Sequence, residues 1–183
     1  WIKLRVTNTE DNRADAFIEV PFPNIDEVSF YAYQSAGLAQ EEHTGIAHPF
    51  GSRQIKDRNF VFKIEIPANS TMNYLIRVER KYDELLLPIR LIKASSYSGH
   101  LIWDITGNSI FIGISFFFII AAMAYGIVIR DKMSFTLTIM LAFILIFHIG
   151  DSGLGFQLLW PNLPWLQPKI RPLGSFISQS AFV

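Results

Sequence analysis

The 183-residue sequence has no cysteine, which excludes a disulfide scaffold, a thiol enzyme and a cysteine-ligated metal site. It also has no net charge, because 16 basic residues balance 16 acidic ones. Domains that bind nucleic acid by bulk attraction carry clustered positive charge, so we expect no nucleic-acid partner. Phosphate-loop, His-Glu-(x)2-His and nucleophile-elbow motifs are missing too. We therefore expect no catalytic residue, no cofactor and no metal in this chain.

Charge is scarce in the second half of the sequence. Residues 1–106 carry 26 of the 32 charged residues, and only six charges follow, at Arg130, Asp131, Lys132, Asp151, Lys169 and Arg171. A composition step of this kind is typical of a soluble domain joined to a membrane segment.

Two long apolar runs follow the step. Ile105–Ile129 contains 25 residues without a charge, and Met133–Gly150 contains 18 more. Twenty helical residues span roughly 30 Å, the thickness of the hydrocarbon core of a bilayer. The pattern predicts two transmembrane helices within residues 110–159, joined by a tight turn at 130–133. Ala122 and Gly126 form a small-xxx-small pair that would let another helix approach closely.

Tryptophan and proline mark the membrane interface. Trp103 precedes the first run, and two further tryptophans follow the second, where amphipathic rings settle at the headgroup level. Three prolines within Trp160–Pro168 exclude a helix interior, so we expect residues 160–171 to form an interfacial loop. Residues 172–183 are apolar but too short to cross, and we interpret them as the start of a truncated third helix. With no signal peptide before Trp1, we expect a fragment of a longer protein.

The first 94 residues show short apolar–polar alternations separated by turn residues, which is typical of β-strands. The expected strands are Trp1–Thr7, Ala16–Val20, Glu27–Tyr33, Phe60–Ile66, Asn73–Glu79 and Leu85–Lys93, with a long loop from Gln34 to Asp57. The spacing predicts an all-β sandwich over residues 1–94, followed by a juxtamembrane connector at 95–109.

Five short segments, in their order and spacing, resemble the bacterial seven-transmembrane receptors with diverse intracellular signalling modules (7TMR-DISM). They are Trp1–Asn8, Pro49–Arg53, Arg58–Phe62, Arg130–Asp131 and Gly153–Pro161. The resemblance implies an extracytoplasmic sensor domain of jelly-roll-like, carbohydrate-binding-module-like fold. It also implies a multi-pass protein of the bacterial inner membrane, with further transmembrane helices and a cytoplasmic signalling domain outside this chain. The charge pattern alone does not set the orientation, whereas the resemblance places the sandwich outside the cell.

Candidate ligand-binding residues lie in the sandwich. Tyr31 and Tyr33 share one side of a strand and could offer a flat aromatic face to the apolar side of a sugar. Outward tyrosines are also common simply because they form sheets well. His48, Arg53 and Arg58 could supply polar or anion-binding groups from the long loop and the residues after it.

Two sets of residues could in principle hold a metal ion: Glu41, Glu42, His43 and His48 for a transition metal, and Asn24, Asp26 and Glu27 for calcium. Neither set has the spacing of a defined site. A solvated loop is the better interpretation of both.

The sequence therefore favours the sensing and anchoring part of a receptor whose sandwich binds a small ligand, such as a carbohydrate, and whose helices contact membrane lipid. The alternative is a membrane-tethered interaction module that docks another periplasmic protein. A membrane enzyme would need a polar site within the bundle, for which His148 with Asp151 is the candidate. Interfacial solvation is the simpler interpretation of that pair.

Overall fold

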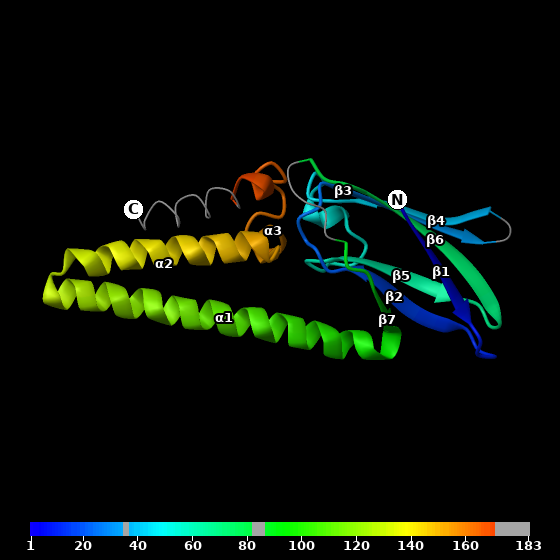
Figure 1. Ribbon diagram of the computed structural model, residues 1–183, viewed down its shortest axis with the longest axis horizontal. Coiled ribbons are helices and arrows are strands. Elements are labelled where there is room, and N and C mark those ends of the chain that lie inside the picture. The colour runs from blue at the N-terminus through cyan, green and yellow to red at the C-terminus, as the bar shows by residue number, and fades with distance from the viewer. Residues whose placement is uncertain (35–36, 82–86, 171–183) are drawn as a thin grey trace.

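The computed structural model describes residues 1–34, 37–81 and 87–170. A two-layered β-structure lies at one end of the molecule, and a pair of long antiparallel helices extends away from it (Figure 1). This arrangement confirms the predicted fold class of a β-sandwich followed by two apolar helices. The predicted start of a third helix at 172–183 lies outside the described residues.

The sandwich consists of two antiparallel sheets. Sheet A has the strand order β1 (Ile2–Asn8), β6 (Ser70–Glu79), β3 (Glu27–Gln34) and β4 (Gly37–Thr44). Sheet B has the order β5 (Phe60–Ile66), β2 (Ala14–Val20) and β7 (Arg90–Lys93). Because β4 and β5 are the last strands of their sheets, each has one edge that pairs with no other strand of the described chain.

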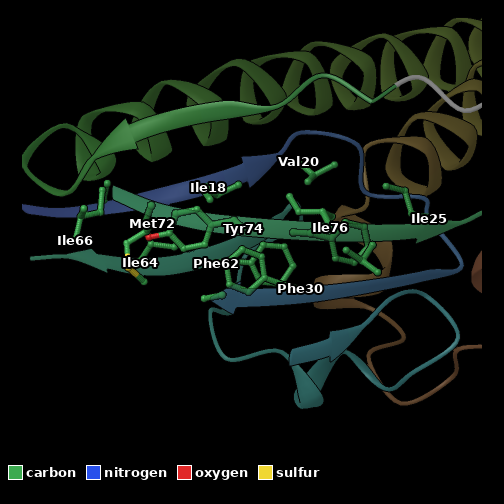
Figure 2. Packing of buried hydrophobic residues seen from close by; sticks show 14 residues of the cluster. Ile18, Val20, Ile25, Phe30, Phe62, Ile64, Ile66, Met72, Tyr74 and Ile76 are labelled. Atoms are coloured by element: carbon green, nitrogen blue, oxygen red, sulfur yellow. The ribbon is translucent and has the colours of Figure 1, made fainter. Parts of the chain in front are cut away.

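The core lies between the sheets and follows the alternation of the strands. The Phe30 ring of β3 stacks on the Phe62 ring of β5 with centroids 4.5 Å apart, which joins the two layers. Figure 2 shows these rings among aliphatic side chains of both sheets. The fully buried members of this cluster include Ile18, Val20, Ile25, Ile64, Tyr74 and Ile76.

Strand β4 corrects the predicted loop from Gln34 to Asp57. Gly37–Thr44 pairs with β3, from Val28 opposite Thr44 to Gln34 opposite Gly37. The segment shows no apolar alternation because an edge strand keeps most of its side chains in solvent and tolerates polar residues. The remainder of the predicted loop connects β4 to β5 and contains one short 3-10 turn, Phe50–Ser52.

Two helices account for the membrane half. Helix α1 (Ala94–Ile129) and helix α2 (Lys132–Asp151) are each long and apolar enough to cross a bilayer. Arg130 adopts a left-handed conformation, and the Asp131 carboxylate then accepts hydrogen bonds from the first amides of α2. This N-cap explains why an Arg-Asp pair makes such a tight turn.

The predicted connector at 95–109 forms the first turns of α1, because β7 leads into the helix without a loop. At 1.5 Å per residue, 36 helical residues measure about 54 Å, well beyond the roughly 30 Å of the hydrocarbon core. The first part of α1 is therefore available to contact the sandwich.

Gly126 is the point at which the two helices come close. A Cβ placed on it would lie 3.2 Å from the Cβ of Ser134 on α2. Gly126 belongs to the small-xxx-small pair noted in the sequence. The helix that comes close to it is α2, the partner of α1 in the hairpin.

Candidate functional site

The junction between sandwich and helices is centred on Arg58, in the turn before β5. Its guanidinium binds both carboxylate oxygens of Asp104 on α1, at 2.6 and 2.5 Å, and its Nη1 donates to the Ser152 carbonyl at the end of α2, at 2.7 Å. Both charged side chains are largely buried, with 15% and 22% exposure. One side chain of the sandwich therefore binds both the first part of α1 and the C-terminal end of α2.

Arg53 fixes the turn that carries Arg58. Its Nη1 donates to the Asp57 and Arg58 carbonyls at 2.7 and 2.8 Å. The guanidinium lies over the rings of Phe50 and Phe60, at 4.7 and 4.4 Å from their centroids. Burial lowers the pKa of Arg53 to about 10, which still leaves the group charged at neutral pH.

A second polar contact joins sheet B to the first turns of α1. Glu19 of β2 is almost fully buried, and its carboxylate accepts hydrogen bonds from Asn59 at 2.7 Å and pairs with His100 of α1 at 3.0 Å. One turn earlier, the Tyr97 hydroxyl donates to Asp57 at 2.8 Å. Buried carboxylates need such partners, so these contacts hold α1 at one position on the sheet.

The end of α2 packs directly against the sandwich. Gly153 has φ +78°, and a Cβ placed there would lie 2.5 Å from the Cβ of Pro23, so only glycine fits the turn. Helix α3 (Leu154–Leu158) then carries Phe156 into an apolar cluster with Ile46 and Phe50 of the β4–β5 connection.

The segment after α3 is tied to the same place by a buried amide, at the point where the chain becomes helical over residues 167–170 and corrects the predicted loop at 160–171. Pro168 fits there because a proline is tolerated in the first turn of a helix. Gln167 has no exposed surface and donates to the Asn24 side chain and the Gly150 carbonyl, at 2.7 and 2.8 Å. Its oxygen accepts from the Trp160 indole at 2.8 Å. Asn24 in turn donates to the Asp151 carbonyl, so the sandwich, α2 and the segment after α3 share one hydrogen-bonded network.

A different surface carries the predicted tyrosines. Tyr31 and Tyr33 both lie on the outer face of sheet A, where Tyr31 stacks on Trp1 with ring centroids 6.1 Å apart. The Arg77 guanidinium lies over the Trp1 ring, and the His43 ring contacts Tyr31 edge-on. Trp1 is 75% exposed, so this face presents aromatic surface beside hydrogen-bonding groups.

The five predicted site residues therefore do not come together. Tyr31 and Tyr33 share the outer face of sheet A, whereas Arg53 and Arg58 lie at the junction with the helices. His48 is half-buried in the turn that leads to Phe50. Ligand binding by any of the five stays a prediction.

The residues weighed for metal binding are spread over opposite faces. Glu41 and His43 pair with each other on the outer face of sheet A, at 2.9 Å, whereas Glu42 lies opposite Phe30 on the inner face. Within the three described ranges, no group of three histidine or acidic side chains converges. At the end of α2, the His148 ring packs on Phe111 of α1, with centroids 4.1 Å apart.

Sequence reasoning missed the partners of Arg58 and the role of Glu19. One signal was present, because Asp104 is the only Asp, Glu, Lys or Arg between Lys93 and Arg130. A lone carboxylate at the start of an apolar helix indicates a specific partner. Three of the five segments that carry the family resemblance, 49–53, 58–62 and 153–161, also meet at this junction.

Comparison with known families agrees with this organisation. The family described as 7TMR-DISM extracellular 2 matches residues 1–93, and the family described as 7TM diverse intracellular signalling matches residues 106–183. No curated protein and no solved structure matches the chain. The first match ends with β7, and residues 94–105 between the two matches form the first turns of α1. The chain belongs to the 7TMR-DISM family of membrane sensory receptors, with an extracellular N-terminal domain followed by transmembrane helices.

Proposed function

We propose that this chain is the sensing and anchoring part of a bacterial inner-membrane receptor. The sandwich binds a small ligand, such as a carbohydrate, and the helices pass the event to a cytoplasmic signalling domain outside this chain. The observation that carries the proposal is the contact of Arg58 with both helices, through Asp104 on α1 and the Ser152 carbonyl after α2. A sandwich held in this way cannot shift without moving the helix ends.

The contacts on α1 supply a direct route for the signal. Strand β7 continues into α1, and His100 and Asp104 bind sheet B and the turn before β5. A ligand that changes the packing of the sandwich would thus change the position of the first four turns of α1. This requires the ligand to bind one position of α1 more tightly than another.

The outer face of sheet A is the proposed surface for a sugar. The Trp1 and Tyr31 rings supply flat apolar area, and Arg77 and His43 supply polar groups beside it. A pyranose matches this combination because it has an apolar face and a rim of hydroxyl groups.

The test uses the whole chain in lipid nanodiscs and a panel of neutral and acidic glycans. Hydrogen exchange should slow on β3 and change at residues 94–108 when one glycan binds. Tyr31→Ala should abolish both effects, while Glu10→Ala, an exposed change in the turn between β1 and β2, should abolish neither. A glycan that protects β3 without any change in α1 would contradict the proposed coupling.

The exposed Trp1 and the free edge of β4 favour a second candidate, docking of a periplasmic protein on the same face. A purified partner that protects Trp1 and β4 from exchange, with no glycan doing so, would favour this candidate over the first.

A further inference from the structure

We propose that the sandwich has a second ligand site, in a slot between β4 and β5, which takes an uncharged small molecule bearing hydroxyl or amide groups. The inference rests on the proposed sensing function, but it uses residues other than those on the outer face of sheet A. The slot has a volume of about 310 Å³, within the range of about 300–1,000 Å³ that is typical of small-molecule sites.

The position of the slot follows from the strand order. Strand β4 ends sheet A and strand β5 ends sheet B, so the sandwich is open between them. Residues 39–40 of β4 and 63–65 of β5 line the two walls. Consecutive residues on each wall mean that the strands present their backbone edges, whose free N–H and C=O groups can bind a ligand.

The floor of the slot contains a buried hydroxyl without a partner. Tyr74 of β6 is 1% exposed, and its hydroxyl makes no hydrogen bond within the described residues. Figure 2 shows this hydroxyl beside Met72 and Ile64, which also line the slot. Burial raises the pKa of Tyr74 to about 12, so the group remains a donor. An unpaired buried hydroxyl is costly, and a ligand acceptor in the slot would remove that cost.

The rim adds neutral hydrogen-bonding groups. Gln40 on β4 and Gln54 on the β4–β5 connection both line the slot. An amide side chain offers both donors and an acceptor, which suits a hydroxyl or amide group of a ligand. Ala32 and Met72 on the floor provide apolar contact below these groups.

The charges nearby are already used. Lys63 and Glu65 lie 3.4 Å apart, and Arg13 binds Glu65 at 2.6 Å. Lys63, Glu65 and Arg13 are thus paired, and Tyr74 is the one ionisable group among the described residues of the floor. An anion or a cation would therefore lose its hydration without gaining an opposite charge. This balance selects an uncharged ligand.

The test uses the whole chain in nanodiscs with five probes. N-acetylglucosamine, myo-inositol and N-acetylglycinamide are uncharged, while glucuronate and glucosamine carry one charge each. At least one uncharged probe should shift the side-chain amide resonances of Gln40 and Gln54 with saturation, and neither charged probe should do so. Tyr74→Phe should weaken this binding roughly three- to ten-fold, as expected for one hydrogen bond. Adding Gln40→Ala to that variant should weaken the binding further.

Tyr31→Ala serves as the control, because it changes the outer face and should leave the slot unaffected. The site is contradicted if no uncharged probe shifts these amides, if a charged probe binds as tightly, or if Tyr74→Phe, shown to be folded by its unfolding midpoint, binds unchanged. A peptide that pairs along β4 in place of the probes would also overturn it. Failure here with an intact glycan response at Tyr31 would leave the proposed function standing.

Discussion

The Arg58 guanidinium and the Asp104 carboxylate face each other at two points, 2.6 and 2.5 Å apart, across the boundary between the sandwich and α1. Because paired charges of this kind are worth most when partly buried, removal of one partner should be costly. In the docked state, the first turns of α1 lie against the sandwich. Asp104→Asn should lower the stability of this state by about 1–3 kcal/mol, measured as faster hydrogen exchange over residues 95–108 in nanodiscs.

A double-mutant cycle separates the pair from its surroundings. Arg58→Gln combined with Asp104→Asn should cost less than the sum of the single changes, because the second change removes an already unpaired group. Arg13→Gln provides a matched control, since Arg13 forms an exposed pair with Glu65 and should have little effect. Strict additivity of Arg58 and Asp104 would show that the two do not interact.

His100 is expected to be the second contributor to docking. His100→Ala removes a partner of the buried Glu19 carboxylate and should destabilise docking by about 1–3 kcal/mol. His100→Gln, which retains a donor, should recover part of the loss. The measurement is again exchange at the start of α1, and equal protection in the wild type and His100→Ala would count against this contact.

Gly153 should tolerate no side chain. Gly153→Ala would place a Cβ 2.5 Å from Pro23 on a backbone with φ +78°, so we expect a loss of about 1–3 kcal/mol and a lower unfolding midpoint. Gly99→Ala is the matched control, because Gly99 lies in α1 and a Cβ added to it would meet open space. That change should stabilise the chain by about 0.5–1 kcal/mol. The opposite ranking of the two variants would rule out the close approach at Gly153.

Glu42 should make stability depend on pH. Burial raises the pKa of this carboxyl above its usual range, so the folded chain favours the protonated form. Below about pH 4.3, the pKa of a glutamate in the unfolded chain, Glu42 is protonated in both states and does not lower the free energy of unfolding. As the pH rises through the higher pKa of the folded chain, the buried carboxyl must ionise and the free energy of unfolding falls. Glu42→Gln should therefore raise the unfolding midpoint at pH 7.5 and leave it nearly unchanged at pH 4.

The control for this profile is Glu27→Gln, which changes an exposed carboxylate on the outer face of the same sheet. It should shift the midpoint little at either pH. A Glu42→Gln variant that is less stable than the wild type at pH 7.5 would refute the desolvation argument.

The sequence reveals the elements more readily than their contacts. The alternation of Ile2, Leu4 and Val6 predicts β1, and the apolar runs around Arg130 predict the hairpin, because both patterns are local. Strand β4 escapes prediction because an edge strand with mostly exposed side chains and polar residues on its inner face has no such pattern.

The junction cannot be predicted from local patterns because its partners are far apart in the chain. Arg58 and Asp104 are 46 residues apart, and Arg58 and the Ser152 carbonyl are 94 apart. The same sequence pattern would equally suit Arg58 as an anion-binding residue in a loop. Only the tertiary arrangement shows that its guanidinium already binds protein groups.

The distance between the sandwich and the helical hairpin shows directly whether Arg58 and His100 hold the two parts together. The chain has no native cysteine, so paired spin labels can be placed at Thr71 on β6 and at Val128 near the far end of α1, both exposed positions. In nanodiscs the wild type should give one narrow distance distribution, and the Arg58→Gln, His100→Ala double variant a broad one. A broad distribution in the wild type, or a narrow and unchanged one in the variant, would contradict the claim that these contacts hold the sensor domain on its helices.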